Sequence, residues 1–263
     1  MSCVLTIAGS DSGGGAGIQA DLKTFAAHGV HGLSVLTALT AQHTRGVLEV
    51  SATPPRMIAA QLDAVFDDFA IGALKIGMLG SRATVQAVAR ALDRYPALPI
   101  VLDPVMVASS GAVLLAPDAI DALKDLLLPR ALLLTPNVPE AELLSGERIT
   151  RSAQLARVAR ALRALGPAAV LLKGGHIGRG PVCDVLIDAG GMETFRHPRL
   201  ALDGHGTGCT LSAAIAANLA RGLALRRAVA EATEYLQRAL RCAYRPGRGS
   251  VSVLGHYAAG LRP

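Results

Sequence analysis

The stretch Asp203-Gly204-His205-Gly206-Thr207-Gly208-Cys209-Thr210-Leu211-Ser212 is a glycine-rich turn that leads into a helical pattern. Gly206 and Gly208 permit backbone angles and close approaches that a side chain would block. Apolar residues then recur every fourth position from Leu211 to Leu219, as one face of a helix requires. The free amides of such a first turn, with the helix dipole, attract an anion such as phosphate. The alternative is a tight loop before a core helix, and this stretch alone does not decide between the two.

On either side of this turn, short apolar runs alternate with longer helical patterns, which is typical of a βα-repeating parallel sheet. The predicted strands are Val4–Ala8, Leu33–Leu39, Ala73–Ile76, Ile100–Leu102, Leu132–Leu134 and Ala169–Leu172. Helices are predicted near residues 15–28, 55–68, 82–94, 117–127, 138–145, 152–165, 207–221 and 226–243, and a hairpin from Asp184–Ile187 and Met192–Phe195. No linker or repeat interrupts the alternation, so we expect one α/β domain over residues 1–263.

Composition narrows the class of protein. The 263 residues are 51% hydrophobic and 17% charged, which fits a soluble protein with a buried parallel sheet. We find no membrane-spanning segment, and the start of the chain lacks the basic leader of a signal peptide, so we expect a cytoplasmic protein. The four cysteines lie far apart and form no CxxC or Cys/His cluster, which disfavours a disulfide framework or a structural zinc site.

The net charge of +6 raises the question of nucleic-acid binding, since seven arginines gather between Arg221 and Arg248. Aromatic residues make up only 3% of the chain, and no recognition motif accompanies the arginines. We therefore expect no nucleic-acid partner and interpret the cluster as a solvated helix face or as a surface that attracts anionic substrates.

Chemically capable residues follow almost every predicted strand, at the edge where ligands bind in sheets of this kind. The first strand leads into Gly9-Ser10-Asp11-Ser12-Gly13-Gly14-Gly15-Ala16-Gly17, which is neither a Walker A loop nor GxGxxG. It predicts a polar loop whose backbone approaches a small ligand. Asp21 follows on the next helix, where it either serves that ligand or is a solvated helix residue.

Two side chains suggest a pocket for a heteroaromatic ring. Gln42 follows an apolar run, and its amide both donates and accepts, so it can read such a ring; the alternative is a core glutamine with satisfied hydrogen bonds. Met78 could form a soft apolar wall or simply pack in the core.

Oxygen and ammonium groups at three further strand ends suggest a binding site for magnesium and phosphate. Asp103 and Glu140 carry the oxygen ligands that Mg²⁺ prefers, and Lys173 could reach an ATP phosphate. Asn137 and Glu140 also have the spacing of a helix-capping box, and Lys173 could simply be exposed in a turn. Together with the glycine turn these residues make the set that phosphoryl transfer needs.

In their order along the chain, these motifs resemble those of the ribokinase superfamily, and specifically of the hydroxymethylpyrimidine and phosphomethylpyrimidine kinases of thiamine biosynthesis. The resemblance runs nearly end to end and rests on Ala8–Lys23, Thr37–Gln42, Lys75–Met78, Asp103–Met106, Thr135–Asn137 with Glu140, Lys173–His176 and His205–Ser212.

The resemblance implies a three-layer α/β/α fold and a homodimer. It implies ATP-dependent phosphorylation of 4-amino-5-hydroxymethyl-2-methylpyrimidine to the monophosphate and then to the diphosphate. By motif, the pyrimidine pocket would comprise Gly9, Asp21, Gln42, Met78 and Val105. ATP and Mg²⁺ would be held by Asn137, Glu140, Lys173 and Thr207, with Asp103 as a further metal ligand, and the anion hole by Gly206, Thr207, Gly208 and Cys209.

Cys209 occupies the position where related sugar kinases have an aspartate base. Helix-end amides can lower the pKa of a thiol, which is near 8.5 when unperturbed, so Cys209 could deprotonate or orient the hydroxymethyl oxygen. It could instead be a weakly charged neighbour that tolerates the phosphorylated substrate, which an aspartate would repel.

The chain departs from the family pattern at two places. Gly247-Arg248-Gly249 stands where a lysine is expected, which leaves Arg248 as a candidate phosphate contact, and Ala112 stands where an acidic or amide residue is frequent. The rival functions are a pyridoxal or pyridoxine kinase and a noncatalytic pyrimidine-binding protein. Gln42, Met78 and Cys209 favour the aminopyrimidine, and Asn137 and Glu140 favour catalysis.

Overall fold

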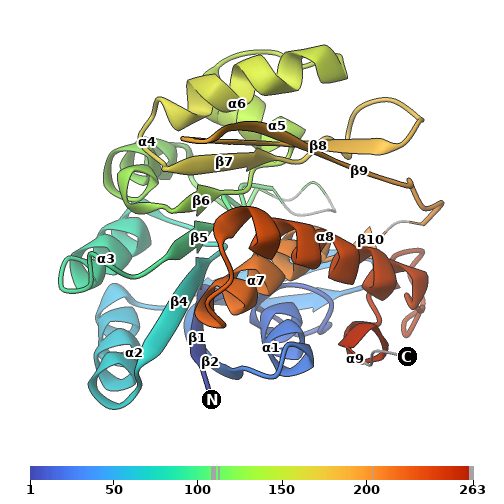
Figure 1. Cartoon of the computed structure of the whole chain (residues 1–263). Coiled ribbons are helices and arrows are strands. Elements are labelled where there is room, and N and C mark those ends of the chain that lie inside the picture. Colours follow the sequence, from blue (N-terminus) through green and yellow to red (C-terminus); the bar gives the residue numbers. More distant parts are fainter. Residues whose placement is uncertain (108–110, 112, 203, 261–263) are drawn as a thin grey trace.

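A nine-stranded sheet forms the centre of the computed structural model, which describes residues 1–107, 111, 113–202 and 204–260 (Figure 1). Its order is β3-β2-β1-β4-β5-β6-β7-β8-β9. The strands are β1 (Cys3–Asp11), β2 (His31–His43), β3 (Gly46–Ala52), β4 (Ile71–Ile76), β5 (Ile100–Leu102), β6 (Leu133–Leu134), β7 (Ala169–Leu172), β8 (Val182–Asp188) and β9 (Gly191–His197). The pairs from β2 to β7 are parallel, and β3, β8 and β9 add antiparallel strands at the two edges.

Helices cover both faces of this sheet, so the expected three-layer α/β/α fold is confirmed (Figure 1). One face carries α2 (Pro55–Asp68), α3 (Arg82–Leu92), α4 (Pro117–Leu126), α5 (Val138–Ser145) and α6 (Leu155–Arg163). The other carries α1 (Gly17–Ala27), α7 (Thr207–Ala220), α8 (Leu225–Arg241) and α9 (His256–Gly260). None of the described helices combines the length and apolar character needed to cross a membrane.

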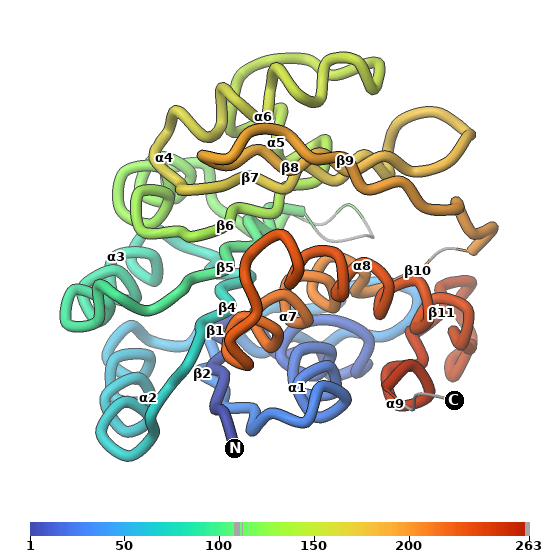
Figure 2. Tube along the Cα trace, viewed as in Figure 1, coloured from blue at the N-terminus to red at the C-terminus, as the bar shows by residue number. Residues whose placement is uncertain are grey.

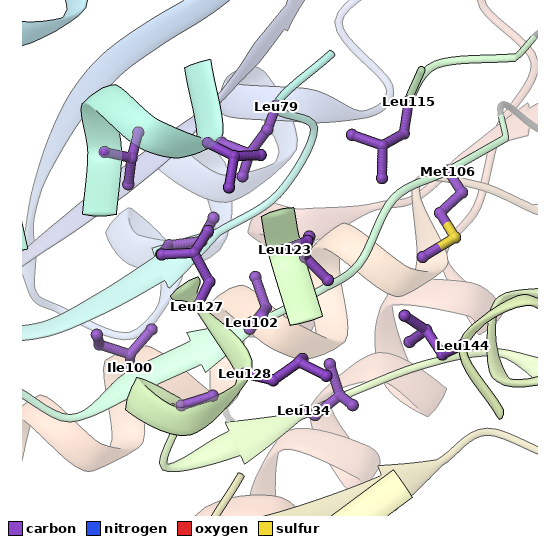
Figure 3. Packing of buried hydrophobic residues seen from close by; sticks show 14 of the residues in the cluster. Leu79, Ile100, Leu102, Met106, Leu115, Leu123, Leu127, Leu128, Leu134 and Leu144 are labelled. Atoms are coloured by element: carbon purple, nitrogen blue, oxygen red, sulfur yellow. The ribbon is translucent and has the colours of Figure 1, made fainter. Parts of the chain in front are cut away.

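Alternation along the central strands feeds two hydrophobic cores. In β1, Val4 packs against the α1/α7 side and Leu5 against the α2/α3 side, because successive side chains of a strand point to opposite faces. Figure 3 shows part of the core on the α2/α3 side, which includes Leu102 of β5, Leu134 of β6 and Leu123 of α4. Burial on both faces explains why these strands appear in the sequence as continuous apolar runs.

The structure adds elements that the sequence did not predict. Besides β3, these are the short parallel pair β10 (Gly204–His205) and β11 (Ser252–Val253), and the helix α9 (Figure 2). Residues 152–154 are a 3-10 turn rather than the start of α6. Asp203 of the glycine-rich stretch and most of the 107–112 loop, including Ala112, lie outside the described residues.

Candidate active site

A cavity of about 460 Å³ opens at the carboxyl edge of the parallel strands. Its walls come from the ends of β1, β2 and β4, the segments after β5, β6 and β7, and the first turn of α7. All but one of the residues that the motifs assign to the site line it: Gly9, Gln42, Met78, Asp103, Val105, Asn137, Glu140, Lys173, Gly206, Thr207, Gly208 and Cys209. Arg248, the candidate phosphate contact outside these motifs, does not line it. The parallel sheet brings the lining residues together, because it gathers the carboxyl ends of its strands at one edge.

Asp21 is the exception, and the expectation that it lines the ring pocket is corrected. Its side chain is fully buried where α1 packs on the sheet, and it accepts hydrogen bonds from Lys75 Nζ at 2.8 Å and from the Thr6 hydroxyl at 2.6 Å. Burial raises the pKa of Asp21, and Lys75 limits the rise. Asp21 therefore acts on the cavity through Lys75, which does line it.

Lys75 is a site residue that the sequence analysis quoted within a motif and gave no role. It is 0% exposed, yet the carboxylates of Asp21 and Asp103 outweigh the effect of burial and raise its pKa, so it stays charged. The signal was one lysine in the otherwise apolar run Ala73-Leu74-Lys75-Ile76. A buried charge is costly unless it is paired, so its pairing fixes a positive charge at the cavity wall.

The glycine turn adopts the conformation that the sequence suggested. Gly206 has φ +80° as the N-cap of α7, and an added Cβ would collide with the carbonyl oxygen of Gly15. A Cβ at Gly208 would come within 3.0 Å of Lys173 Nζ. The amides of Thr207, Gly208 and Cys209 belong to the first turn of α7 and have no acceptor within the helix. The turn thus presents a row of donors beside a lysine, which suits a phosphate.

Asp11 organises the loop that faces this turn. Its carboxylate accepts from the amides of Gly13, Gly15 and Ala16 at 2.8–2.9 Å, and Oδ2 lies 3.2 Å from His205 Nε2. Burial alone would raise the pKa of Asp11, but His205 and the amides outweigh it and lower the pKa. The loop between β1 and α1 is therefore held in place by a buried, ionised carboxylate whose two oxygens both accept hydrogen bonds.

Lys173 lies between the acidic groups predicted for the metal. Its Nζ donates to Asp103 at 2.9 Å, and Asp103 and Glu140 outweigh burial to raise its pKa. The described residues hold no cluster of three or more acidic, His or Cys side chains that could bind a metal alone. The open wall at Gly208, next to Asp103 and Lys173, fits a Mg²⁺ held by one or two carboxylates, water and phosphate oxygens.

Asn137 and Glu140 form the capping box that was the alternative reading, and they also line the cavity. The Glu140 amide donates to Asn137 Oδ1 at 2.9 Å, and the Asn137 amide donates to Glu140 Oε2 at 2.8 Å. Burial raises the pKa of Glu140 to about 7, and Lys173 limits the rise. The cap leaves Oε1 of Glu140 for other partners.

The pKa of the Cys209 thiol favours one of its two interpretations, the weakly charged neighbour over the base. Burial raises its pKa to about 11, although Lys75 opposes this, so the helix-end amides do not make it a thiolate. A group of this pKa is protonated and uncharged at neutral pH. Its place at the cavity wall is as predicted.

A second cavity, of about 300 Å³, continues from the first beyond the glycine turn. The two share six lining residues, including Asn137, Lys173 and Thr207. Its own walls are mostly aliphatic, with Arg199 and a short polar array of Asp184, His197 and Gln237. No sequence motif indicates this cavity, because the residues of its own walls come from β8, β9, α7, α8 and the segments after β7 and β9.

The fold and these two joined cavities agree with the ribokinase-like fold and small-molecule kinase that the sequence motifs indicate. The phosphomethylpyrimidine kinase family model matches residues 11–254. The hydroxymethylpyrimidine/phosphomethylpyrimidine kinase of Rhizobium meliloti is 51% identical over 94% of this chain and 95% of its own. The thiamine biosynthesis bifunctional protein ThiED of Geobacter sulfurreducens is also 51% identical, and there the chain spans 50% of the relative's length.

The chain belongs to the phosphomethylpyrimidine kinase family, as the sequence motifs indicated, and it is a kinase. Among solved structures, the ADP complex of Bacillus subtilis pyridoxal kinase superposes with a TM-score of 0.91 at 33% identity and covers all of both chains.

Proposed function

We propose that this protein phosphorylates hydroxymethylpyrimidine with ATP and then phosphorylates the monophosphate, within thiamine biosynthesis. The observation that carries the proposal is the first cavity, which joins a ring-sized end at Gln42, Met78 and Val105 to the amides of the glycine turn. Family membership and the relatives' names support the same reaction.

The pyrimidine occupies the β1/β2/β4 end of the cavity. Gly9 suits this place, because an added Cβ would lie 3.0 Å from the Met78 sulfur and narrow the space for a ring. The Gln42 amide supplies polar contacts to ring nitrogens and the amino group, and Met78 and Val105 supply apolar walls.

ATP lies on the other side of the glycine turn. Its phosphates meet the amides of Thr207 and Gly208 together with Lys173 and Asn137, and its nucleoside extends into the second cavity. Asp103 and Glu140 are the carboxylates that would hold Mg²⁺ beside the phosphates. When bound, the ion would neutralise phosphate charge during transfer.

Where the phosphoryl group is transferred, the protein contributes fixed positive charges, and we assign no side chain as a general base. Lys75 and Lys173 place two ammonium groups at the cavity wall, where they stabilise the charge that develops as the hydroxymethyl oxygen attacks the γ-phosphorus. The bond from the γ-phosphorus to the bridging oxygen breaks, ADP leaves, and the hydroxyl proton passes to a phosphate oxygen or to solvent. Cys209, which remains a thiol, makes room for that oxygen without adding negative charge. An uncharged neighbour suits the second step, in which the acceptor is itself a phosphate.

Product analysis tests the proposal. The purified protein, hydroxymethylpyrimidine and Mg-ATP should give first the monophosphate and then the diphosphate, resolved by anion-exchange chromatography. ATP consumption without a diphosphate product would contradict the two-step assignment.

A pyridoxal kinase activity is the second candidate, because of the close superposition on the Bacillus subtilis enzyme. The same assay with pyridoxal at equal concentration separates the two functions. We expect the higher kcat/KM with the aminopyrimidine, and the reverse order would favour the second candidate.

We further propose that residues 1–263 form one domain that acts as a cytoplasmic homodimer. An apolar surface on the edge strand β3 supports the dimer. Leu48, which lies at a register shift of β3 against β2, and Val50 are 73% and 44% exposed. An unpaired edge with exposed apolar side chains is a surface that a second copy can cover.

A further inference from the structure

One arginine holds the glycine-rich loop that lies beside the two cavities. The loop comprises residues 174–180, between β7 and β8, and Arg199 reaches it from the segment after β9. The Arg199 guanidinium donates to three carbonyl oxygens of this loop. The bonds run from Nη1 to Gly175 at 2.6 Å, from Nη2 to Ile177 at 2.9 Å and from Nε to Gly180 at 3.1 Å. Each nitrogen of the guanidinium therefore contacts the 174–180 loop.

The composition of the loop explains why it needs this support. Four of its seven residues are glycines, at positions 174, 175, 178 and 180. Glycine loses the most conformational freedom on folding, so such a loop has little preference for one backbone conformation. Near its start, Asp184 accepts from the Gly174 amide at 2.8 Å, and the Ile177 amide donates to the Gly174 carbonyl at 3.0 Å. Arg199 extends this fixed region to Gly180.

A guanidinium suits these contacts better than an ammonium group. It is planar, and its five N–H donors point in fixed directions, so it can reach three separate carbonyl oxygens. A lysine has a single nitrogen on a flexible stem. The contacts therefore depend on the shape of arginine and not on positive charge alone.

The 174–180 loop forms part of the nucleotide side of the site. His176 lines both cavities, as does Lys173, the residue before the loop, and Gly175 and Arg199 line the second cavity. The ring end of the first cavity is built instead from residues at the ends of β1, β2 and β4. A displaced loop should therefore disturb the nucleotide and leave the pyrimidine in place.

We propose that Arg199 is a positioning residue for the nucleotide. It orders the 174–180 loop before ATP binds, so that ATP binding does not bear the entropy cost of ordering this segment. The inference rests on the proposed function, which places the nucleoside in the second cavity.

Kinetics with Arg199→Ala test the proposal. The variant should raise KM for ATP roughly tenfold, because ATP must then order the loop, and should leave KM for hydroxymethylpyrimidine within about twofold. KM values do not depend on the fraction of the protein that folds. Arg199→Lys keeps the charge and should resemble the alanine variant more than wild type. Arg196→Ala is the matched control, since it removes another exposed arginine, from β9, and should leave both KM values unchanged.

Added guanidinium ion gives a readout that a general loss of structure would not. Arg199 is exposed, so a free guanidinium ion can enter the space that Arg199→Ala leaves. At concentrations far below those that unfold proteins, this ion should lower the KM of the variant for ATP toward the wild-type value. Ammonium chloride of the same ionic strength should not.

Trypsin tests the order of the loop without any substrate. Arg179 lies inside the loop and is exposed, and cleavage after it requires the loop to open locally. Arg199→Ala should be cut after Arg179 at least roughly tenfold faster than wild type or Arg196→Ala, as measured by mass spectrometry of the early fragments.

The inference is overturned if Arg199→Ala raises both KM values alike, or if ammonium lowers its KM for ATP as much as guanidinium does. It is also overturned if all three proteins are cut after Arg179 equally fast. A wild type that phosphorylates nothing with ATP, yet is protected at Arg179 by Arg199, would overturn the proposed function and leave the ordering of the loop standing.

Discussion

Gly206 shows that the conformation of the glycine turn depends on a single residue. Its positive φ and the carbonyl of Gly15 leave no room for a Cβ, so this turn can be built only with glycine. The turn therefore positions the α7 amides and the β1–α1 loop together, since each restricts the other.

Gly206→Ala should unfold more readily than wild type and lose activity. The left-handed conformation costs an alanine about 1–2 kcal/mol, and the collision with Gly15 adds to this. Displaced donors should lower kcat by at least about 100-fold. Gly222→Ala is the matched control, because Gly222 also has a positive φ, of +87°, but open space around it. Equal kcat values for the two variants would contradict the role of the turn.

Cys209 carries a prediction about the two phosphorylation steps. Because its thiol is uncharged at neutral pH, Cys209→Ala should keep kcat for each step within about tenfold of wild type. Cys209→Asp adds a negative charge beside an acceptor phosphate and should slow the second step at least roughly tenfold more than the first. Separate assays with the hydroxymethyl compound and with its monophosphate check this. An alanine variant inactive in both steps would restore the base hypothesis.

Most of the residues that gather at the cavity could be predicted from the sequence, but the burial and the charged neighbours that shift their pKa values could not. The family resemblance assigned Asp21 to the ring pocket, whereas packing of α1 turns it toward Lys75 inside the protein. The pKa of Cys209 depends on burial and on Lys75, which lies 134 residues away in the chain and is brought near by the fold.

At the scale of elements, α7 and α9 are linked through a buried histidine. His256 is 2% exposed and lies 3.0 Å from the Thr210 hydroxyl through Nε2, and its carbonyl accepts from the Tyr235 hydroxyl. Burial lowers the pKa of His256 to about 4. The helix α7, which begins at the glycine turn, is thus hydrogen-bonded to a histidine that is neutral in the folded protein.

This contact should make stability depend on acid. The unfolded chain takes up a proton on His256 near pH 6.5, and the folded protein only near pH 4. The contribution is therefore complete above about pH 6.5 and is lost as pH falls toward 4, by about 2–3 kcal/mol at pH 4.5. Unfolding free energies at pH 7.5 and 4.5 for wild type and His256→Gln measure it. A variant that loses as much stability as wild type between these pH values would contradict the assignment.

Buried elements were predictable, and exposed or very short ones were not. Apolar runs and helical periods gave α2, β5, α5 and β7 with the bounds that the structure has. β3 was missed although it has seven residues, because most of them are exposed and form no apolar run. The pair β10 and β11 consists of two residues each, and α9 of five, which is too short for a period to appear. The second cavity was missed for a related reason, since its polar array spans three elements.

At the scale of the whole molecule, the two edges of the sheet differ in exposed apolar surface. The β3 edge exposes Leu48 and Val50, while β9 at the opposite edge exposes Met192. The proposed dimer therefore has two possible edges, and a substitution on each distinguishes them.

Leu48→Lys should convert the dimer to a monomer in sedimentation equilibrium, because it places a charge in an apolar contact. Met192→Lys, at a side chain 53% exposed, is the matched control and should leave the mass unchanged. A monomeric wild type, or dissociation by the control alone, would contradict a dimer through β3.

The parallel pair of β10 with β11 sets the order in which a newly made chain can become active. The turn at Gly204–His205 is tied to Ser252–Val253, and α7 rests on His256. Ribosomes make the strand ends, both lysines and the glycine turn well before these residues. A nascent chain can therefore assemble most of its sheet during synthesis. Its glycine turn lacks the contacts with β11 and His256 until the segment around Val253 has left the ribosome.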